Sequence, residues 1–271
     1  MERLRVGDVS LAVEVAGTGP PVLFVGGTGM PRIGWALSEP RVRVAGFRTV
    51  VFDGRGVGDS DAPEGPYSIE GMTSDAAGLI EALELAPCHV VGVSQGGLIA
   101  EELSRRRPEL VRSAVLIASA GRPSAFAGLL STSGLELSRA LDSQVPPVVD
   151  VAETVALMLS SAQLQDDDLV TLWAELSAGR AWNGPGRIGQ QSANVAWHER
   201  EDLEAGWGQV RRPVLVIAFE HDVLFTPRAG RQAAAAMPDA EFLEVAGAGH
   251  GGVAVKSDEV ADAIVAFLRR H

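Results

Sequence analysis

The chain has 271 residues, of which 46% are hydrophobic and 21% are charged, and its formal net charge is -12. A chain of this length and composition can bury the core of one large α/β domain with an insertion. The acidic balance argues against binding to nucleic acids or anionic membranes, because a phosphate-binding surface needs clustered basic residues. The single cysteine, Cys88, excludes an internal disulfide bond and cysteine-rich zinc motifs, so we expect no metal site.

The first residues carry no apolar signal core, and no apolar run approaches the roughly 18 residues that a membrane-spanning helix needs. We therefore expect a soluble cytoplasmic protein that acts on a small molecule, without a nucleic-acid or membrane partner. The sequence predicts no particular oligomeric state.

Eight short segments have the pattern of β-strands. The first two alternate apolar and polar residues as a hairpin does, and five of the others are apolar runs typical of buried strands. The last, 241–245, is a further predicted strand. Segments with the apolar spacing of helices recur between them. Strands that alternate with helices predict an α/β fold with a mainly parallel, doubly wound sheet of eight strands. The predicted strands are 4–6, 9–15, 21–25, 49–52, 89–93, 113–119, 213–219 and 241–245.

The alternation of strands and helices stops after residue 121 for about eighty residues. Within that stretch, apolar residues three and four apart predict helices over 125–131, 149–162, 168–177 and 189–198. We predict that residues 122–205 form a helical cap inserted after the sixth strand. Residues 1–121 and 206–271 are then expected to form the core.

The pentapeptide Gly92-Val93-Ser94-Gln95-Gly96 joins the fifth predicted strand to a predicted helix. A serine at the apex of such a sharp turn needs glycines two residues before and after it, because a Cβ atom there would collide with the neighbouring strand or helix. The strain lifts the serine hydroxyl clear of the sheet. Ser94 is therefore a candidate nucleophile, although a serine in a tight turn could also be purely structural.

A serine nucleophile needs a histidine that takes its proton and a carboxylate that orients the histidine. Asp222 follows the seventh predicted strand, and His250 lies in a glycine-rich loop after the eighth, in the order that this type of turn requires. Each could singly be a turn or loop residue. All three would have to occur in the right order by chance, however, so their combination favours a catalytic triad. Glu220 is a rival acid that lies closer to its strand. The other histidines considered are interpreted as structural or loop residues: His89, His198 and His221.

With these motifs the chain resembles the α/β-hydrolase superfamily, in particular the esterases, lactonases and cofactor-free haloperoxidases whose cap follows the sixth strand. The segment 53–60, Asp-Gly-Arg-Gly-Val-Gly-Asp-Ser, is similar to that superfamily's Asp-x-Arg-Gly-x-Gly-x-Ser loop, and its expected role is structural. A dinucleotide-binding loop is a weaker interpretation, because the third glycine of Gly-x-Gly-x-x-Gly is missing and no helix follows. The resemblance implies a hydrolase without a cofactor.

Family members generally carry His-Gly after the third strand, whereas this chain has Gly26-Gly27-Thr28 there. The resemblance implies an oxyanion hole formed by backbone N–H groups, one from Gln95 and one from Thr28 or Gly27. Such preorganised donors stabilise the alkoxide that develops during acyl transfer, each by on the order of 3 kcal/mol. Because Gly26 replaces the usual histidine, the second donor stays open between Gly27 and Thr28.

Four tryptophans are candidates to line a pocket over Ser94. Trp173, Trp182 and Trp197 belong to the predicted cap, and Trp35 follows the loop that carries Gly26, Gly27 and Thr28, here called the oxyanion loop. We expect some of these rings to form an apolar substrate pocket, although each ring alone could merely hold the cap on the core. The predicted cap has no evident cluster of charged residues for a charged substrate, which favours a mainly apolar one.

The sequence therefore predicts a serine hydrolase that cleaves a carboxylic ester, lactone or thioester of a mainly apolar small molecule through an acyl-Ser94 intermediate. His250 would act as base and then as acid, and Asp222 would orient it. Two alternatives use the same triad: a carbon-carbon bond hydrolase, and an acyl transferase or perhydrolase. A third alternative is a ligand-binding protein with a vestigial triad, and the intact set of three residues counts against it.

Overall fold

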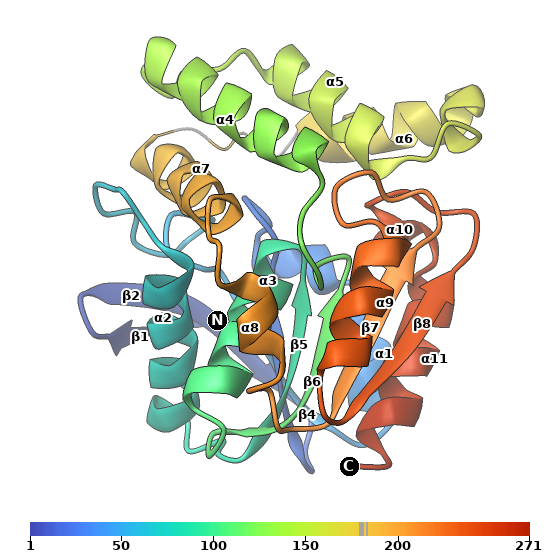
Figure 1. The fold of residues 1–271 in the computed structure, drawn as a ribbon. Helices are drawn as coiled ribbons and strands as arrows, with labels where there is room; N and C mark the ends of the chain where they lie inside the picture. Colours follow the sequence, from blue (N-terminus) through green and yellow to red (C-terminus); the bar gives the residue numbers. More distant parts are fainter. Residues whose placement is uncertain (179–181, 183) are drawn as a thin grey trace.

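The computed structural model describes residues 1–178, 182 and 184–271, and an eight-stranded sheet lies at its centre (Figure 1). The strands are β1 (Glu2–Val6), β2 (Val9–Ala16), β3 (Pro21–Val25), β4 (Arg48–Phe52), β5 (Cys88–Val93), β6 (Val111–Ile117), β7 (Val214–Phe219) and β8 (Ala240–Val245). Their order is β1-β2-β4-β3-β5-β6-β7-β8. The pairs β1 with β2 and β2 with β4 are antiparallel, and the other pairs are parallel. The predicted mainly parallel sheet is thus confirmed.

Alternate residues of the central strands pack against opposite faces of the sheet. In β3, Leu23 and Val25 belong to an apolar cluster on one face, whereas Val22 and Phe24 belong to a cluster on the other. β5 and β7 are buried along their whole length. Burial on both faces explains why these strands appear in the sequence as nearly continuous apolar runs.

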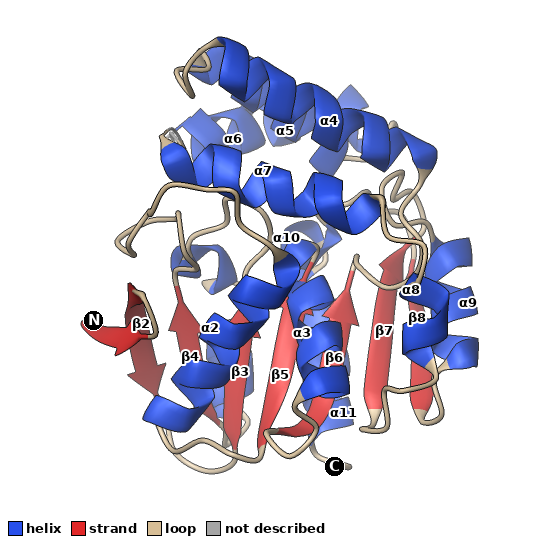
Figure 2. Cartoon of the chain, turned by 60° about the vertical axis from the view of Figure 1, so that its left-hand side comes forward, coloured by secondary structure: helices blue, strands red, loops and turns tan. Residues whose placement is uncertain are grey.

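Helices cover both faces of the sheet, as Figure 2 shows. The first apolar cluster includes residues of α2 (Ile69–Ala82), α3 (Gln95–Arg106), α8 (Leu203–Trp207) and α9 (Pro227–Ala236). The second includes residues of η1 (Arg32–Trp35), α1 (Glu39–Val44) and α11 (Ser257–Leu268), with α10 (Gly252–Val255) packed against it. This is the doubly wound arrangement that the alternation of strands and helices predicts.

Between β6 and α8 the chain forms helices. They are α4 (Ala125–Ala140), α5 (Pro147–Met158), η2 (Gln163–Gln165), α6 (Asp167–Ala178) and α7 (Pro185–His198). α4 packs on α7 and α5 packs on α6, and these helices lie beyond the carboxyl ends of the strands (Figure 1). In the part of the chain that the structure describes, no helix combines the length and the apolar character that crossing a membrane requires.

α4 and α7 extend well beyond the ranges that the sequence pattern predicts, and α6 exceeds its range by one residue at each end. α4 continues to Ala140 because its small residues pack on α7: a Cβ added to Gly134 would lie 3.0 Å from the side-chain amide of Gln191. α7 begins at Pro185, since proline fits the first turn of a helix, where its missing N–H is not needed.

The predicted boundary between residues 205 and 206 falls inside α8. Leu203 and Trp207 of this helix are buried in the first apolar cluster together with residues of α3. The division of the chain into core and cap stays a prediction. The segment 183–186, Asn-Gly-Pro-Gly, has the composition of a turn, and its first residue, Asn183, lies outside the described residues.

Candidate active site

Three loops at the carboxyl ends of parallel strands bring the predicted triad together. Ser94 follows β5, Asp222 follows β7 and His250 follows β8. His250 Nε2 lies 3.0 Å from Ser94 Oγ, and His250 Nδ1 lies 2.8 Å from Asp222 Oδ2. Because the carboxyl ends of parallel strands share one edge of the sheet, residues far apart in the sequence join in one chain of hydrogen bonds.

The chemistry of the three groups sets the direction of these hydrogen bonds. An ionised carboxylate can only accept, so Nδ1 of His250 carries a proton and donates it to Asp222. In the neutral ring Nε2 is then an acceptor, and the Ser94 hydroxyl donates to it. This is the arrangement in which an imidazole can remove a serine proton.

Asp222 is held in place by three hydrogen-bond donors. The residue is only 3% exposed, and its Oδ1 accepts from the backbone N–H groups of Leu224 at 2.8 Å and Phe225 at 3.1 Å. The Phe225 ring stacks on the imidazole of His250 with ring centroids 6.3 Å apart. The buried carboxylate is therefore satisfied on both oxygens and fixed in direction.

Ser94 has a strained backbone conformation, with φ at 52° and ψ at -123°. A Cβ added to Gly92 would overlap the carbonyl oxygen of Gly96, and one added to Gly96 would overlap the carbonyl oxygen of Val25. The prediction that both positions need glycine is confirmed. The turn places the Ser94 hydroxyl at the edge of the sheet, where it meets His250.

The rival acid and the other histidines have different surroundings. Glu220 accepts a hydrogen bond from the N–H of Gly247 at 2.9 Å, and His221 beside it is exposed. His89 is buried in β5, where burial lowers its pKa to about 4. Burial also lowers the pKa of His198 in α7. None of these four side chains hydrogen-bonds to the triad in the described part of the chain.

The loop after β3 passes directly beside Ser94. A Cβ added to Gly27 would lie 3.2 Å from the Cβ of Ser94. Within the described residues, the backbone N–H groups of Gly27, Thr28 and Gln95 donate to no other group. These N–H groups are therefore available to an oxygen atom of a ligand.

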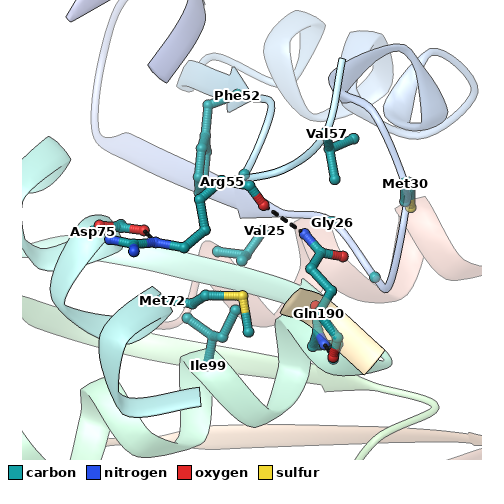
Figure 3. Close-up of a pocket in the computed structure, with 13 residues that line it drawn as sticks. Val25, Gly26, Met30, Phe52, Arg55, Val57, Met72, Asp75, Ile99 and Gln190 are labelled. Atoms are coloured by element: carbon teal, nitrogen blue, oxygen red, sulfur yellow. Dashed lines mark hydrogen bonds and ion pairs between the residues drawn. The ribbon is translucent and has the colours of Figure 1, made fainter. Parts of the chain in front are cut away.

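A small cavity adjoins this loop, and Gly26, Phe52, Met72 and Ile99 are among its lining residues (Figure 3). Its volume of about 20 Å³ is enough for about one water molecule.

A Cβ added to Gly26 would lie 2.8 Å from the carbonyl oxygen of Met30. A histidine at position 26 therefore does not fit unless the loop moves, and the close approach of Met30 explains the glycine.

The loop over 53–60 anchors the chain just after the loop that follows β3. Asp53 is fully buried and accepts from the backbone N–H groups of Arg32 at 2.6 Å and Asp59 at 2.9 Å, and also from the Arg32 guanidinium. The Ser60 hydroxyl donates to the carbonyl oxygen of Asp53. These contacts agree with the structural role expected for the loop.

Trp173 and Trp182 approach the loops that carry the site. A Cβ added to Gly251, next to His250, would lie 2.9 Å from the Trp173 ring. A Cβ added to Gly29 would lie 2.7 Å from the Trp182 ring. Both rings thus lie against glycines that border the site, and their role in a substrate pocket stays a prediction.

Trp35 and Trp197 are placed differently. They are 1% and 3% exposed, and each belongs to one of the two apolar clusters of the sheet. Trp35 packs on Phe24 of β3, with ring centroids 5.1 Å apart, and the Arg200 guanidinium lies 4.5 Å from the centroid of Trp197. These contacts correspond to the alternative in which the rings hold neighbouring elements together.

Two polar residues of α7, Gln190 and Asn194, were not among the predicted site residues. The Gln190 side chain accepts from the N–H of Gly29, and the Asn194 side chain bonds to the side chains of Thr28 and Gln95. The sequence indicates these contacts only through the spacing of four residues between Gln190 and Asn194, which puts both amides on one face of a helix.

No metal site of the usual kind is found over residues 1–178, 182 and 184–271. No group of three or more His, Cys, Asp or Glu side chains is placed there to hold a metal ion. Cys88 is buried in β5, and burial raises the pKa of its thiol to about 12, so its surroundings are those of a packing residue.

Comparison with known proteins agrees with this architecture. The model of the alpha/beta hydrolase fold family matches residues 20–256. The "Putative non-heme bromoperoxidase BpoC" of Mycobacterium tuberculosis is 35% identical over 263 residues, which cover 96% of this chain and 98% of that protein. Its crystal structure superposes with a TM-score of 0.88 and 34% sequence identity over 96% of both chains.

Two further proteins are similar along nearly the whole chain. The 2-(acetamidomethylene)succinate hydrolase of Mesorhizobium japonicum is 28% identical over 98% of this chain and 94% of its own length. A thermophilic esterase from Thermogutta terrifontis, solved with malate bound, is 25% identical, with a TM-score of 0.85 over 100% of this chain and 99% of that one. Because the family model spans most of the chain and the mycobacterial relative is 35% identical to it, the protein belongs to the α/β-hydrolase fold family.

Proposed function

We propose that this protein is a serine hydrolase that cleaves a carboxylic ester, lactone or thioester through an acyl-Ser94 intermediate. The observation that carries the proposal is the continuous chain of hydrogen bonds from Ser94 through His250 to Asp222, at 3.0 and 2.8 Å. Gln95 follows Ser94 directly, and Gly27 and Thr28 belong to the loop that passes beside Ser94. The backbone N–H groups of these three residues bind no other described residue. A purely structural serine has no need of a histidine and a buried carboxylate in this order.

In the first half of the reaction, Ser94 Oγ attacks the carbonyl carbon of the substrate while His250 Nε2 takes the hydroxyl proton. The carbonyl oxygen becomes an alkoxide, which binds the N–H of Gln95 and that of Thr28 or Gly27. Collapse of this intermediate breaks the bond to the alcohol or thiol. The leaving group departs with the proton from His250, and the acyl group stays on Ser94.

In the second half, water attacks the carbonyl carbon of acyl-Ser94 and gives a proton to His250 Nε2. The same N–H groups bind the second alkoxide. Asp222 accepts from Nδ1 throughout and stabilises the imidazolium that forms in both halves. Release of the carboxylic acid, with return of the proton to Oγ, restores the Ser94 hydroxyl.

The surroundings of Ser94 favour a mainly apolar small molecule. Trp173 and Trp182 border the loops of the site, and the α7 side chains that bond to the candidate donor segments, Gln190 and Asn194, are uncharged. We assign residues 122–205 the role of a cap that encloses the substrate.

The Thermogutta relative is named an esterase, and the Mesorhizobium relative is named for the hydrolysis of a succinate derivative.

A second candidate function is that of a perhydrolase, and it rests on the name of the mycobacterial relative, "Putative non-heme bromoperoxidase BpoC". In such an enzyme hydrogen peroxide replaces water in the attack on acyl-Ser94. The products are a peroxycarboxylic acid and the free serine hydroxyl. The two candidates share the acyl-enzyme and differ only in its acceptor.

A panel of p-nitrophenyl esters, aliphatic lactones and acyl thioesters tests the proposal. The wild type is expected to turn over at least one class, and Ser94→Ala is expected to abolish that turnover while remaining folded. Added hydrogen peroxide then separates the two candidates, because only a perhydrolase forms peroxycarboxylic acid. Turnover that survives in Ser94→Ala, or a folded wild type that acts on none of the three classes, would contradict the proposed function.

A further inference from the structure

The side chain of Asn194 in α7 joins the two segments that carry the candidate oxyanion donors. Its Nδ2 donates to Thr28 Oγ1 at 3.0 Å, and its Oδ1 accepts from Gln95 Nε2 at 2.8 Å. Thr28 belongs to the loop after β3, and Gln95 is the first residue of α3. One amide group therefore sets the spacing between two segments that are otherwise separate in the chain.

Gln190, one turn earlier in α7, binds the same region. Its Oε1 accepts from the N–H of Gly29 at 2.8 Å, and its Nε2 donates to the carbonyl oxygen of Arg55 at 2.9 Å (Figure 3). Its own carbonyl oxygen accepts from Gln95 Nε2 at 3.2 Å. Gln190 and Gln95 are only 3% and 2% exposed, so little water competes for these bonds. Gln190 also occupies the N–H of Gly29, which leaves those of Gly27 and Thr28 for an oxyanion.

The oxyanion loop has little stiffness of its own. Three of its residues, Gly26, Gly27 and Gly29, are glycines, and Gly29 has a φ of 64°. Glycine loses more conformational freedom on ordering than any other residue. A donor stabilises a transition state only if it is already in place, and a displacement of about 1 Å can reduce a rate roughly 100-fold. Inside the loop, the N–H of Met30 donates to the carbonyl oxygen of Gly27 at 3.0 Å. Contacts from outside the loop add to this bond in holding its donor.

Other contacts attach this part of the chain to the core without touching either donor segment. Arg200, just after α7, pairs with Glu70 of α2 at 3.0 Å. At the start of the insertion, the Ser124 hydroxyl donates to the carbonyl oxygen of Val223 at 2.7 Å. Arg200 thus anchors the end of α7 independently of Gln190 and Asn194, and Ser124 anchors the start of α4.

We propose, on the basis of the serine mechanism above, that Gln190 and Asn194 are positioning residues for the oxyanion hole. Asn194 holds Thr28 and Gln95 at the spacing that binds one oxygen atom, and Gln190 fixes the loop beside them. α7 then contributes to the chemical step through the donors that it holds, besides covering the site.

Alanine variants give the first test. Asn194→Ala is expected to lower kcat for p-nitrophenyl butyrate by about 10-fold to 100-fold with KM within about twofold, because displaced donors weaken transition-state binding more than substrate binding. Gln190→Ala should act in the same direction. The matched control is Gln191→Ala, which removes the neighbouring amide that bonds to Ser138 of α4, and its kcat should stay within about twofold of the wild type.

A pair of oxygen and sulfur substrates separates positioning from a general loosening of the structure. The sulfur of a thionoester accepts hydrogen bonds less well than a carbonyl oxygen, so a preference for the oxoester measures how well the donors are placed. In Asn194→Ala the ratio of kcat/KM for the oxoester to that for the matching thionoester should fall by about 10-fold. A loosened structure would lower both values alike, and an unchanged ratio would overturn the inference.

Thr28→Val provides a second route, because it removes the hydroxyl that Asn194 binds and keeps the backbone N–H. Asn194→Ala should lower kcat by a smaller factor in the Thr28→Val background than in the wild type, since both changes break the bond between Asn194 and Thr28. Equal factors in both backgrounds would count against positioning through Thr28. If Asn194→Ala does not fold, the ratio of kcat/KM for the oxoester to that for the thionoester in Thr28→Val tests the inference by itself. A fall in this ratio would support the inference, and an unchanged ratio would overturn it.

Failure of this inference can be told from failure of the proposed function. A wild type that forms acyl-Ser94, with Asn194→Ala and Thr28→Val behaving like Gln191→Ala, would refute only the positioning role. A folded wild type that hydrolyses no ester and forms no acyl-enzyme would refute both.

Discussion

His250 donates from Nδ1 to a carboxylate oxygen of Asp222 at 2.8 Å, and this bond holds the tautomer in which Nε2 can accept the Ser94 proton. Asp222→Asn keeps the shape but offers an amide, which stabilises the opposite tautomer. We expect kcat to fall on the order of 10⁴-fold with little change in KM. Ester turnover before and after the change measures this. Glu220→Gln is the matched control, since Glu220 binds Gly247, and near wild-type kcat in Asp222→Asn would refute the assignment of the acid.

Gly96→Ala tests the strained turn at the nucleophile. The added methyl group would meet the carbonyl oxygen of Val25, a backbone atom of a central strand that cannot move aside. We expect the free energy of unfolding to drop by about 3 kcal/mol or more, or the chain to fail to fold. Gly208→Ala is the control: its φ is -64° and an added Cβ meets nothing within 4 Å, so urea unfolding should change by about 1 kcal/mol at most. Equal effects of the two changes would contradict this account of the turn.

Asp53→Ala tests the anchor behind the oxyanion loop. It leaves the N–H groups of Arg32 and Asp59 and the Arg32 guanidinium without their buried acceptor. The free energy of unfolding should fall by about 3 to 5 kcal/mol. Glu14 also pairs with Arg32, but its side chain is 49% exposed. Glu14→Gln should therefore change the free energy of unfolding in urea by less than about 1 kcal/mol. A small effect of Asp53→Ala would show that the loop is not held in this way.

Burial of His89 predicts a pH-dependent stability. Its pKa in the folded protein is about 4, below the ordinary 6.5, so between these values the unfolded chain binds a proton that the folded chain does not. The stability that depends on a neutral His89 is fully present above about pH 6.5 and is lost as the pH falls toward about 4. From pH 7 to pH 5 the free energy of unfolding of the wild type should fall by about 2 kcal/mol more than that of His89→Gln. Urea unfolding at both pH values measures the difference, and parallel pH profiles would rule the effect out.

The strands and the three residues of the candidate triad can be predicted because each leaves a local pattern. Ser94 and Asp222 each follow a short apolar run that matches β5 or β7, and His250 follows the predicted strand that matches β8. The glycines on both sides of Ser94 are required by close backbone contacts, and such requirements are visible in a sequence.

The contacts of α7 leave no such pattern. Gln190 and Asn194 are 161 and 166 residues from Gly29 and Thr28, and an amide on a helix has no periodicity that points to a distant loop. Likewise, nothing near Trp197 in the sequence distinguishes a ring buried in the core from one that faces a substrate. These features depend on how the insertion packs on the sheet, which only the three-dimensional structure provides.

The central claim is that Ser94 is an activated nucleophile, and the intact mass of the protein after exposure to a fluorophosphonate tests it most directly. The reagent reacts with an activated serine and does not require the natural substrate. We predict that the wild type gains the mass of one phosphonyl group, whereas Ser94→Ala and His250→Ala, both folded, gain none. A folded wild type that stays unlabelled, or a Ser94→Ala variant that is labelled to the same extent, would contradict the account.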